Sequence, residues 1–273
     1  MHRTFLLLAL TFFACSTKDK TPDALEAYLT QTFAHVARIE DFFIAAGDRK
    51  PKETDRPSSS TGKEVFDTAV RLFESLLDQD EDGVVDRPPL VAALAKYLVF
   101  VIDYTDVTDK EEEKIQSQYG NYVMTMKSDI WPYMPSFIMG NCDLTLTKLN
   151  TSMWRPETYN ALWEECFHTV TEAQNRIDPS FSFEPGSVLG AYMQADISAG
   201  TYNISEQNNM EGGNYDFVTA VNEYMHQIWL INACGGSEIL NVHQRAVLTL
   251  MGTVGVPLTI NIDYALDLAE MVK

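Results

Sequence analysis

The stretch LLDQDEDGVVDRPPL, residues 76 to 90, constrains the fold of this chain more than any other. It gathers four aspartates around a single glycine, and like charges at this spacing repel one another unless water or a cation compensates them. Apolar residues recur at three- and four-residue steps before the stretch, from Val65 to Leu77, and after it, from Leu90 to Val101. Such a period is typical of helices with one buried face. The sequence therefore predicts a helix–loop–helix unit with the aspartates in its loop.

The aspartates follow the spacing of calcium ligands in an EF-hand loop when Asp78 is taken as loop position 1. Glycine stands at position 6, where such a loop turns sharply, and Val85 at position 8 is expected to pack on the apolar side. Position 12 departs from the pattern, because Pro89 replaces the usual bidentate glutamate, so water or a distant acid would complete the coordination. The predicted calcium ligands are Asp78, Asp80, Asp82, the carbonyl of Val84, and Asp86.

The same periodicity predicts a mainly α fold, a single helical domain that contains this one EF-hand-like helix–loop–helix. The first helix is expected to run from Thr21 to near Gly47, and a third apolar helix to run from Pro89 through Val101. A mixed, aromatic-rich segment near 119–155 can include short strands. Further helices are predicted at 109–118, 157–175, 186–199, 215–234, 241–252 and 263–272.

The N-terminus has the features of an export signal: a basic start, an apolar run over residues 5–14, and a polar break. The run is too short to span a bilayer, which requires roughly 20 apolar residues. We expect a signal peptide at 1–16 and secretion, with lipid anchoring through Cys15 as the alternative. The remaining chain is expected to comprise an N-terminal helix with a flexible loop at 17–61 and the helical domain at 62–273.

The balance of charges limits the partners. The chain has 39 Asp and Glu residues against 20 Lys and Arg, which gives a formal net charge of −19. Phosphate groups would be repelled by such a surface, which argues against nucleic acids and anionic membranes as partners. Cations are the favoured partners, and calcium is the one that the aspartate loop indicates.

A second constellation combines glutamate and histidine in the segments ALWEECFHTVTE and VNEYMHQIW. On a helix, Glu164 and His168 lie on one face because they are four residues apart. One interpretation is a variant of the H-E-x-x-H zinc-peptidase helix, in which Glu164 replaces the first His, Glu165 is the general base and His168 is the second ligand. Glu223 on the later helix would be the third ligand. The loss of the first His weakens the expected affinity for zinc.

Two other interpretations of these residues remain open. Glu165-x-x-His168 and Glu223-x-x-His226 could be the two Glu-x-x-His motifs of a di-iron carboxylate bundle. That site needs two more glutamates, for which Glu40 and Glu74 are candidates. Alternatively, all of these residues form charged stripes on amphipathic helices and bind no metal.

The segments LLDQDEDGVVDRPPLVAAL, ALWEECFHTVTEA, FEPGSVLGAYMQADISAG and VNEYMHQIW together resemble a sparsely characterised group of secreted, EF-hand-type calcium-binding proteins. The second half of those proteins is similar to a degenerate metallopeptidase helix of the form EExxH. The resemblance spans roughly residues 65 to 235 and implies no particular activity. It implies calcium at the five positions of the aspartate loop named above.

These observations lead to one expected function and two alternatives. The chain is expected to be a secreted calcium-binding protein in which calcium acts mainly as a structural staple. The first alternative is a calcium-stabilised, zinc-dependent hydrolase of peptidase type that uses the EExxH helix. The lesser alternative is a di-iron carboxylate helical protein.

Overall fold

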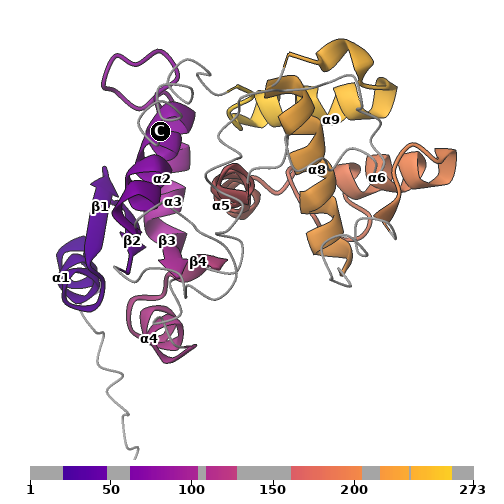
Figure 1. Ribbon diagram of the computed structural model, residues 1–273. Helices are drawn as coiled ribbons and strands as arrows, with labels where there is room; N and C mark the ends of the chain where they lie inside the picture. Colours follow the sequence, from indigo (N-terminus) through magenta and orange to yellow (C-terminus); the bar gives the residue numbers. More distant parts are fainter. Residues whose placement is uncertain are drawn as a thin grey trace, which may run out of the picture.

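The computed structural model describes residues 21–47, 62–103, 109–127, 161–204, 216–233 and 235–259. In this part of the chain most residues are helical, and four strands form one mixed sheet (Figure 1). The helices are α1 (Pro22–Thr32), α2 (Gly62–Leu77), α3 (Pro88–Tyr97), α4 (Asp109–Tyr119), α5 (Ala161–Ile177), α6 (Val188–Ala199), α8 (Phe217–Ala233) and α9 (Val242–Val254), with a short 3-10 helix η4 at Ser237–Ile239. The strands are β1 (His35–Ile39), β2 (Phe42–Ala46), β3 (Leu98–Asp103) and β4 (Tyr122–Lys127).

The strands lie in the sheet in their chain order, β1-β2-β3-β4. β1 and β2 form an antiparallel hairpin in which Ile39 is opposite Phe42. β2 and β3 are parallel, as are β3 and β4, with Val99 opposite Phe43 on one side and Val123 on the other. Parallel strands require crossover connections, which are supplied by α2, the aspartate loop and α3 between β2 and β3, and by α4 between β3 and β4.

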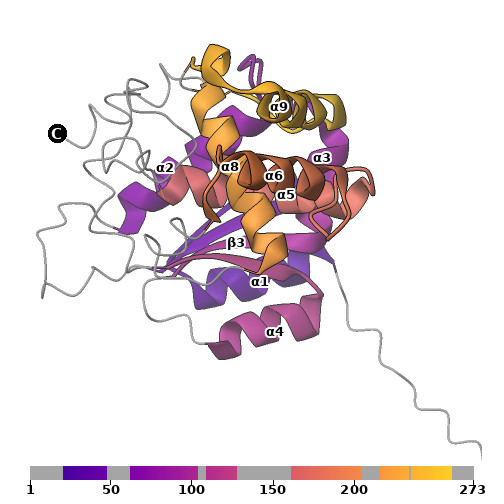
Figure 2. The same cartoon turned by 90° about the vertical axis from the view of Figure 1, so that its right-hand side faces the viewer.

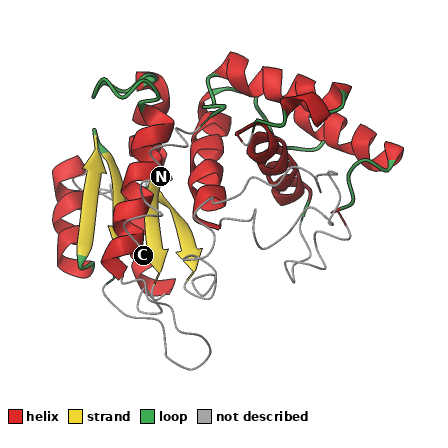
Figure 3. Cartoon of the chain, turned by 45° about the horizontal axis from the view of Figure 1, so that its top comes forward, coloured by secondary structure: helices red, strands yellow, loops and turns green. Residues whose placement is uncertain are grey.

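The sheet is covered by helices on both faces (Figures 2 and 3). Alternate residues of a strand point to opposite faces, so Phe43 and Val99 contribute to a small core with α1 and α4. Their neighbours Phe42 and Phe100 contribute to the main core on the other face, with α2, α3 and α5. Strands buried on both faces are continuous apolar runs, and the sequences of β2 (FFIAA) and β3 (LVFVID) have this composition.

The last four long helices, α5, α6, α8 and α9, build the second half of the described chain, and α5 lies between the sheet layer and the other three (Figure 1). The main core continues through α5 without interruption, because Leu162 and Phe167 belong to the same cluster of buried side chains as Phe100 and Trp229. Helix α5 is therefore packed on both sides, which is the reason that polar residues such as Glu164 and His168 are buried.

Two of the predicted helices are wrong in extent. The helix expected from Thr21 to Gly47 ends at Thr32, and residues 35–46 form the hairpin. The helix expected from Pro89 through Val101 ends at Tyr97, where β3 begins. In both cases the apolar residues fit helical steps, but the segments are rich in β-branched and aromatic side chains, which favour strands. A run of leucine, valine and isoleucine that is buried on all sides has no periodicity by which a helix can be distinguished from a strand.

The mainly helical character is confirmed, with the correction that a four-stranded mixed sheet is present in the described chain. The helices predicted at 109–118, 157–175, 186–199, 215–234 and 241–252 correspond to α4, α5, α6, α8 and α9 with ends that differ by a few residues. β4 is a short strand within the mixed segment near 119–155. The predicted signal peptide, Cys15, the rest of that segment from 128 on, and the helix at 263–272 lie outside the described residues. Among the described helices none has the length and apolar character needed to cross a membrane.

Candidate metal centre

Two facing helices bring four metal-ligating side chains together. Glu164 and His168 lie one turn apart on α5, and Glu223 and His226 lie one turn apart on α8. Each residue offers one ligand atom such that all four atoms lie within 4.8 Å of one another. The cluster therefore joins two residues from each helix at a single point of the α5–α8 interface.

The shortest distances in the cluster run between the helices. His168 Nε2 lies 3.6 Å from Glu223 Oε1, and His226 Nδ1 lies 3.7 Å from Glu164 Oε1. A tetrahedral zinc ion, with bonds of roughly 2.0–2.1 Å, holds neighbouring ligand atoms about 3.4 Å apart. The interhelical pairs are close to that separation, so only small movements would place all four atoms around an ion.

The four residues are buried, with exposed fractions between 1% for His226 and 7% for His168. The Nε2 atom of His168 is enclosed and has no hydrogen-bond partner among the described residues. Buried polar atoms in folded proteins nearly always have a partner, and an exception calls for a specific explanation. A metal ion bound to the nitrogen lone pair is such an explanation.

Burial keeps both imidazoles uncharged. It lowers the pKa of His168 to about 3, and burial, together with the repulsion that a protonated His168 would exert, lowers the pKa of His226 well below its ordinary value. Neutral imidazole is the form that binds metals, because its lone pair is free. At neutral pH both histidines would therefore offer a nitrogen lone pair to a metal ion.

Aromatic rings surround the cluster. Phe167, next to His168 on α5, stacks on Trp229 of α8 with ring centroids 4.6 Å apart. Trp229 in turn lies 6.2 Å from the ring of His226 and 6.1 Å from that of Trp163. These rings fill the space beside the polar atoms with apolar surface, where the low dielectric strengthens the attraction between a cation and the carboxylates.

The structure brings together Glu164, His168 and Glu223, the three zinc ligands predicted from the sequence. His226 is the fourth member of the cluster, which the zinc-peptidase interpretation does not include. Its spacing from Glu223 is visible in the sequence, but only the packing of α8 on α5 shows that it points to the same place. Glu165, the predicted general base, lies half-buried on α5 and is not one of the four residues.

The di-iron interpretation fits this arrangement poorly. It assigns Glu165 to the site, whereas the cluster contains Glu164. Glu40 and Glu74, the candidates for its two further glutamates, line a pocket beside the aspartate loop together with Asp78. Neither belongs to the four residues that converge between α5 and α8.

The aspartate loop forms a second, exposed group of acids between α2 and α3. Carboxylate atoms of Asp78, Asp80 and Asp86 lie within 4.8 Å of one another, whereas Asp82 is not part of this group. Repulsion by the charge of Asp82, with a smaller effect of desolvation, raises the pKa of Asp80 above its ordinary value. The repulsion expected from the sequence is therefore present in the fold.

The backbone of the loop curls around the carboxylate of Asp78. Its two oxygens accept hydrogen bonds from the amides of Asp82, at 3.2 Å, and Gly83, at 2.9 Å. Gly83 has φ of +81°, a conformation that favours glycine, which is why this residue type stands at loop position 6. The side chain of Val84 is 64% exposed, while Val85 packs against the main core. The packing of Val85 is the one expected at loop position 8.

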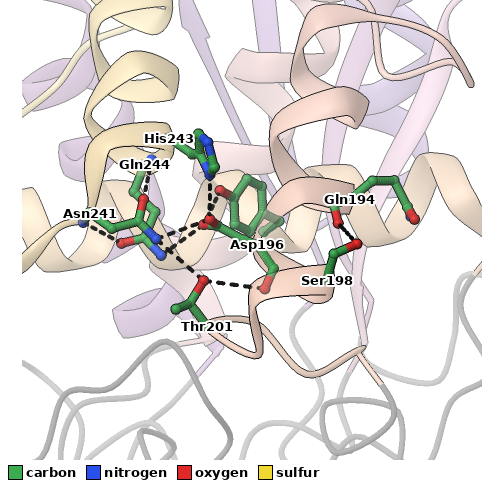
Figure 4. Close-up of polar contacts among 8 residues, drawn as sticks. Gln194, Asp196, Ser198, Thr201, Asn241, His243 and Gln244 are labelled. Atoms are coloured by element: carbon green, nitrogen blue, oxygen red, sulfur yellow. Dashed lines mark hydrogen bonds and ion pairs between the residues drawn. The ribbon is translucent and has the colours of Figure 1, made fainter.

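A third polar cluster, centred on Asp196 of α6, ties three helices together (Figure 4). The buried carboxylate of Asp196 accepts hydrogen bonds from the Tyr224 hydroxyl at 2.6 Å and the Gln244 amide at 2.9 Å. It also accepts one from the Asn241 amide at 3.0 Å and lies 2.9 Å from Nδ1 of His243. Burial by itself would raise the pKa of Asp196, but the hydrogen bonds from these four side chains hold it below its ordinary value. This cluster is a fully bonded structural junction of α6, α8 and α9.

Comparison of the chain with protein-family models, with curated proteins and with solved structures finds no match. The resemblance to secreted EF-hand-type proteins with a degenerate metallopeptidase helix therefore stays a prediction.

Proposed function

We propose that this chain is a metal-binding protein whose buried centre, formed by Glu164, His168, Glu223 and His226, holds one divalent transition metal ion. The observation that carries the proposal is the convergence of four nitrogen and oxygen ligand atoms within 4.8 Å in the interior of the protein. Zinc suits this set best, because it takes imidazole and carboxylate ligands in tetrahedral geometry.

The charges of the site support a divalent ion. Two neutral imidazoles and two carboxylates together carry a charge of −2, which one divalent cation neutralises. Two buried carboxylates without a cation would be costly, because charged groups lose their hydration in the interior. A bound ion therefore lowers the free energy of the folded state by neutralising the two buried carboxylates, and it joins α5 to α8.

Four protein ligands define a closed site. Structural zinc sites have four protein ligands, whereas catalytic sites have three and leave one position open for water or substrate. The zinc-dependent hydrolase predicted from the sequence, with Glu164, His168 and Glu223 as ligands and Glu165 as base, needs such an open position. In our proposal His226 fills it, which favours a structural role for the ion over a catalytic one.

The test compares two variants that each remove one carboxylate charge. Glu223→Gln keeps the shape of the side chain but removes a ligand, and we expect its zinc affinity to fall by more than roughly 100-fold, beyond the loss typical of residues that only orient ligands. Glu172→Gln, half-buried on α5 and paired with Arg176 at 2.7 Å, is the matched control and should keep one zinc per chain. The zinc content of the two variants is measured after dialysis against zinc and a competing chelator.

Three outcomes of this experiment are informative. Equal zinc content in the two variants, or less than one zinc per chain in the unchanged protein, would refute the buried centre. Peptide cleavage by the zinc-loaded protein that disappears in Glu165→Gln, with zinc still bound, would instead establish the hydrolase. Zinc uptake without any cleavage supports the structural role.

We propose calcium binding at the aspartate loop as a second function, supported by the convergence of Asp78, Asp80 and Asp86 and by the curled backbone around Asp78. Calcium takes six to eight hard oxygen ligands, and the Val84 carbonyl, Asp82 and water would complete the set. Because Pro89 replaces the bidentate glutamate, we expect the modest affinity of extracellular calcium modules. Secretion, predicted from residues 1–16, would place the loop in contact with millimolar calcium.

Asp80→Asn is expected to have opposite effects with and without calcium. Without calcium the variant should melt at a slightly higher temperature than the unchanged protein, because one member of a repelling group is neutralised. With calcium it should melt lower, since a ligand is lost and affinity falls by roughly tenfold. Calorimetric titration and thermal melts in chelator and in calcium measure the two effects.

Glu81→Gln is the matched control, because it removes the same charge from the same loop at position 4, which is not a ligand position in the EF-hand pattern. Its calcium affinity should change much less than that of Asp80→Asn. Equal losses in the two variants would mean that calcium is attracted by the general negative charge of the loop, and the specific site would be rejected.

A further inference from the structure

Residues 255–259, which follow α9, lie between the aspartate loop and α8, and we call this segment the strap. At the loop, the side-chain amide of Gln79 donates to the Thr259 carbonyl at 2.7 Å and lies 3.2 Å from the Thr259 hydroxyl. Gln79 stands between two of the proposed calcium ligands, Asp78 and Asp80. Its backbone amide also donates to the carboxylate of Asp86 at 2.7 Å, so Gln79 is part of the loop's own hydrogen-bond network.

A second contact fixes the other end of the strap to the loop. A methyl group placed on Gly255 would lie 2.6 Å from a guanidinium nitrogen of Arg87, so the Arg87 side chain rests directly on the backbone of Gly255. Arg87 follows Asp86, the last acid of the loop. The strap is thus held to both the beginning and the end of the aspartate loop.

The strap also accepts two hydrogen bonds from side chains of α8. The indole nitrogen of Trp229 donates to the Pro257 carbonyl at 2.9 Å, and the side-chain amide of Asn232 donates to the Leu258 carbonyl at 2.8 Å. Val256, between these contacts and Gly255, is buried in the main core. The strap is therefore a bridge of direct hydrogen bonds between the loop and the helix that carries Glu223 and His226.

Trp229 connects this bridge to the buried centre. It follows His226 by three residues, so the two side chains lie on the same face of α8, with ring centroids 6.2 Å apart. The same indole stacks on Phe167, the neighbour of His168 on α5. A displacement of the strap would be transmitted to Trp229. This side chain packs beside His226 on α8 and against Phe167, the neighbour of His168 on α5.

From these contacts we infer that the aspartate loop and the buried centre are thermodynamically coupled through the strap, so that calcium in the loop raises the affinity of the centre for zinc. The inference rests on both proposed functions. Calcium fixes the positions of Asp78, Asp80 and Asp86, and with them Gln79 and Arg87, which hold the strap in the position where Trp229 and Asn232 bind it. By thermodynamic linkage, zinc must raise the affinity for calcium by the same factor.

The experiment is a four-part comparison of zinc affinity, with and without saturating calcium, in the unchanged protein and in Gln79→Ala. Couplings between sites typically amount to about 5- to 150-fold in affinity, and we expect roughly tenfold in the unchanged protein. In Gln79→Ala the factor should fall below about twofold, because the side-chain contact with Thr259 is gone while the ligands of both ions remain. A competing chromophoric chelator that binds zinc but not calcium gives the zinc affinity.

Gln194→Ala, which truncates an exposed glutamine on α6, is the matched control and should keep the full coupling. Equal zinc affinity with and without calcium in the unchanged protein, when calorimetric titration shows that calcium is bound, would overturn the inference while leaving both sites standing. Undiminished coupling in Gln79→Ala would overturn the role of the strap. An unchanged protein that takes up no zinc would refute the buried centre itself, and the inference with it.

Discussion

Zinc in thousandfold excess over its dissociation constant is expected to raise the free energy of unfolding of this protein by about 4 kcal/mol. The physical reason is that Glu164 and Glu223 are far apart along the sequence and only the packing of α5 on α8 brings them together. In our proposal the folded chain therefore binds the ion and the unfolded chain does not. For a protein of this size the gain corresponds to a rise in the melting temperature of roughly 10 °C.

Differential scanning calorimetry in zinc and in a zinc chelator measures this shift. Glu223→Gln, which lacks one ligand, should show almost none of it at the same zinc concentration. A melting temperature of the unchanged protein that is identical in zinc and in chelator would contradict the buried centre. Calcium must be held constant throughout, because calcium bound at the proposed loop site would contribute its own stabilisation by the same mass-action effect.

Replacement of Asp196 by alanine is expected to cost about 4 kcal/mol of folding free energy. The variant leaves the Tyr224 hydroxyl and the Asn241 and Gln244 amides without their shared acceptor in the interior, and each unsatisfied buried donor is costly. Asp178→Ala, in the exposed turn after α5, is the matched control and should cost under about 1 kcal/mol. Denaturant unfolding of the three proteins measures the difference.

The contribution of Asp196 should also depend on pH in a defined direction. Its pKa in the folded protein is below the ordinary value, so the folded state favours the charged carboxylate. The stability that this charge supplies is complete above the pKa of the unfolded chain, and it is lost as the pH falls through the lower pKa of the folded protein. The unchanged protein and Asp196→Asn should therefore converge in stability at acidic pH. A gap that widens on acidification would show that the charge of Asp196 does not stabilise the fold.

The helix–loop–helix around the aspartates could be predicted from the sequence because each of its signals is local. Apolar steps of three and four residues mark α2 and α3, and the position of Gly83 marks the turn in the loop. The strands could not be predicted in the same way. In β3 every residue from Leu98 to Ile102 is apolar, since the strand is buried on both faces, and such a run has no period that separates strand from helix.

For the buried centre, too, only the features that lie within one helix could be predicted from the sequence. The spacing of Glu164 and His168 predicts that they share a face of one helix, and the structure places both in the cluster. Which residues of α8 join them depends on how α5 and α8 pack against each other, and these two helices are separated in the sequence by α6 and the residues on either side of it. The sequence is equally consistent with Glu223 and His226 in a metal site and with both residues in a charged stripe on a helix. Only the tertiary contact of α5 with α8 makes His226 the fourth member of the cluster.

The order of the strands has a consequence for biosynthesis. Each strand pairs only with its neighbours along the chain, so the sheet can assemble progressively while the ribosome is still making later segments. Its main face is nevertheless covered only by α2 and α3 until α5 emerges, and the histidine of α8 appears some sixty residues after the first glutamate of α5. Metal binding at the proposed centre would therefore follow the formation of the sheet, and the ion would join α5 to α8 in a protein whose sheet is already in place.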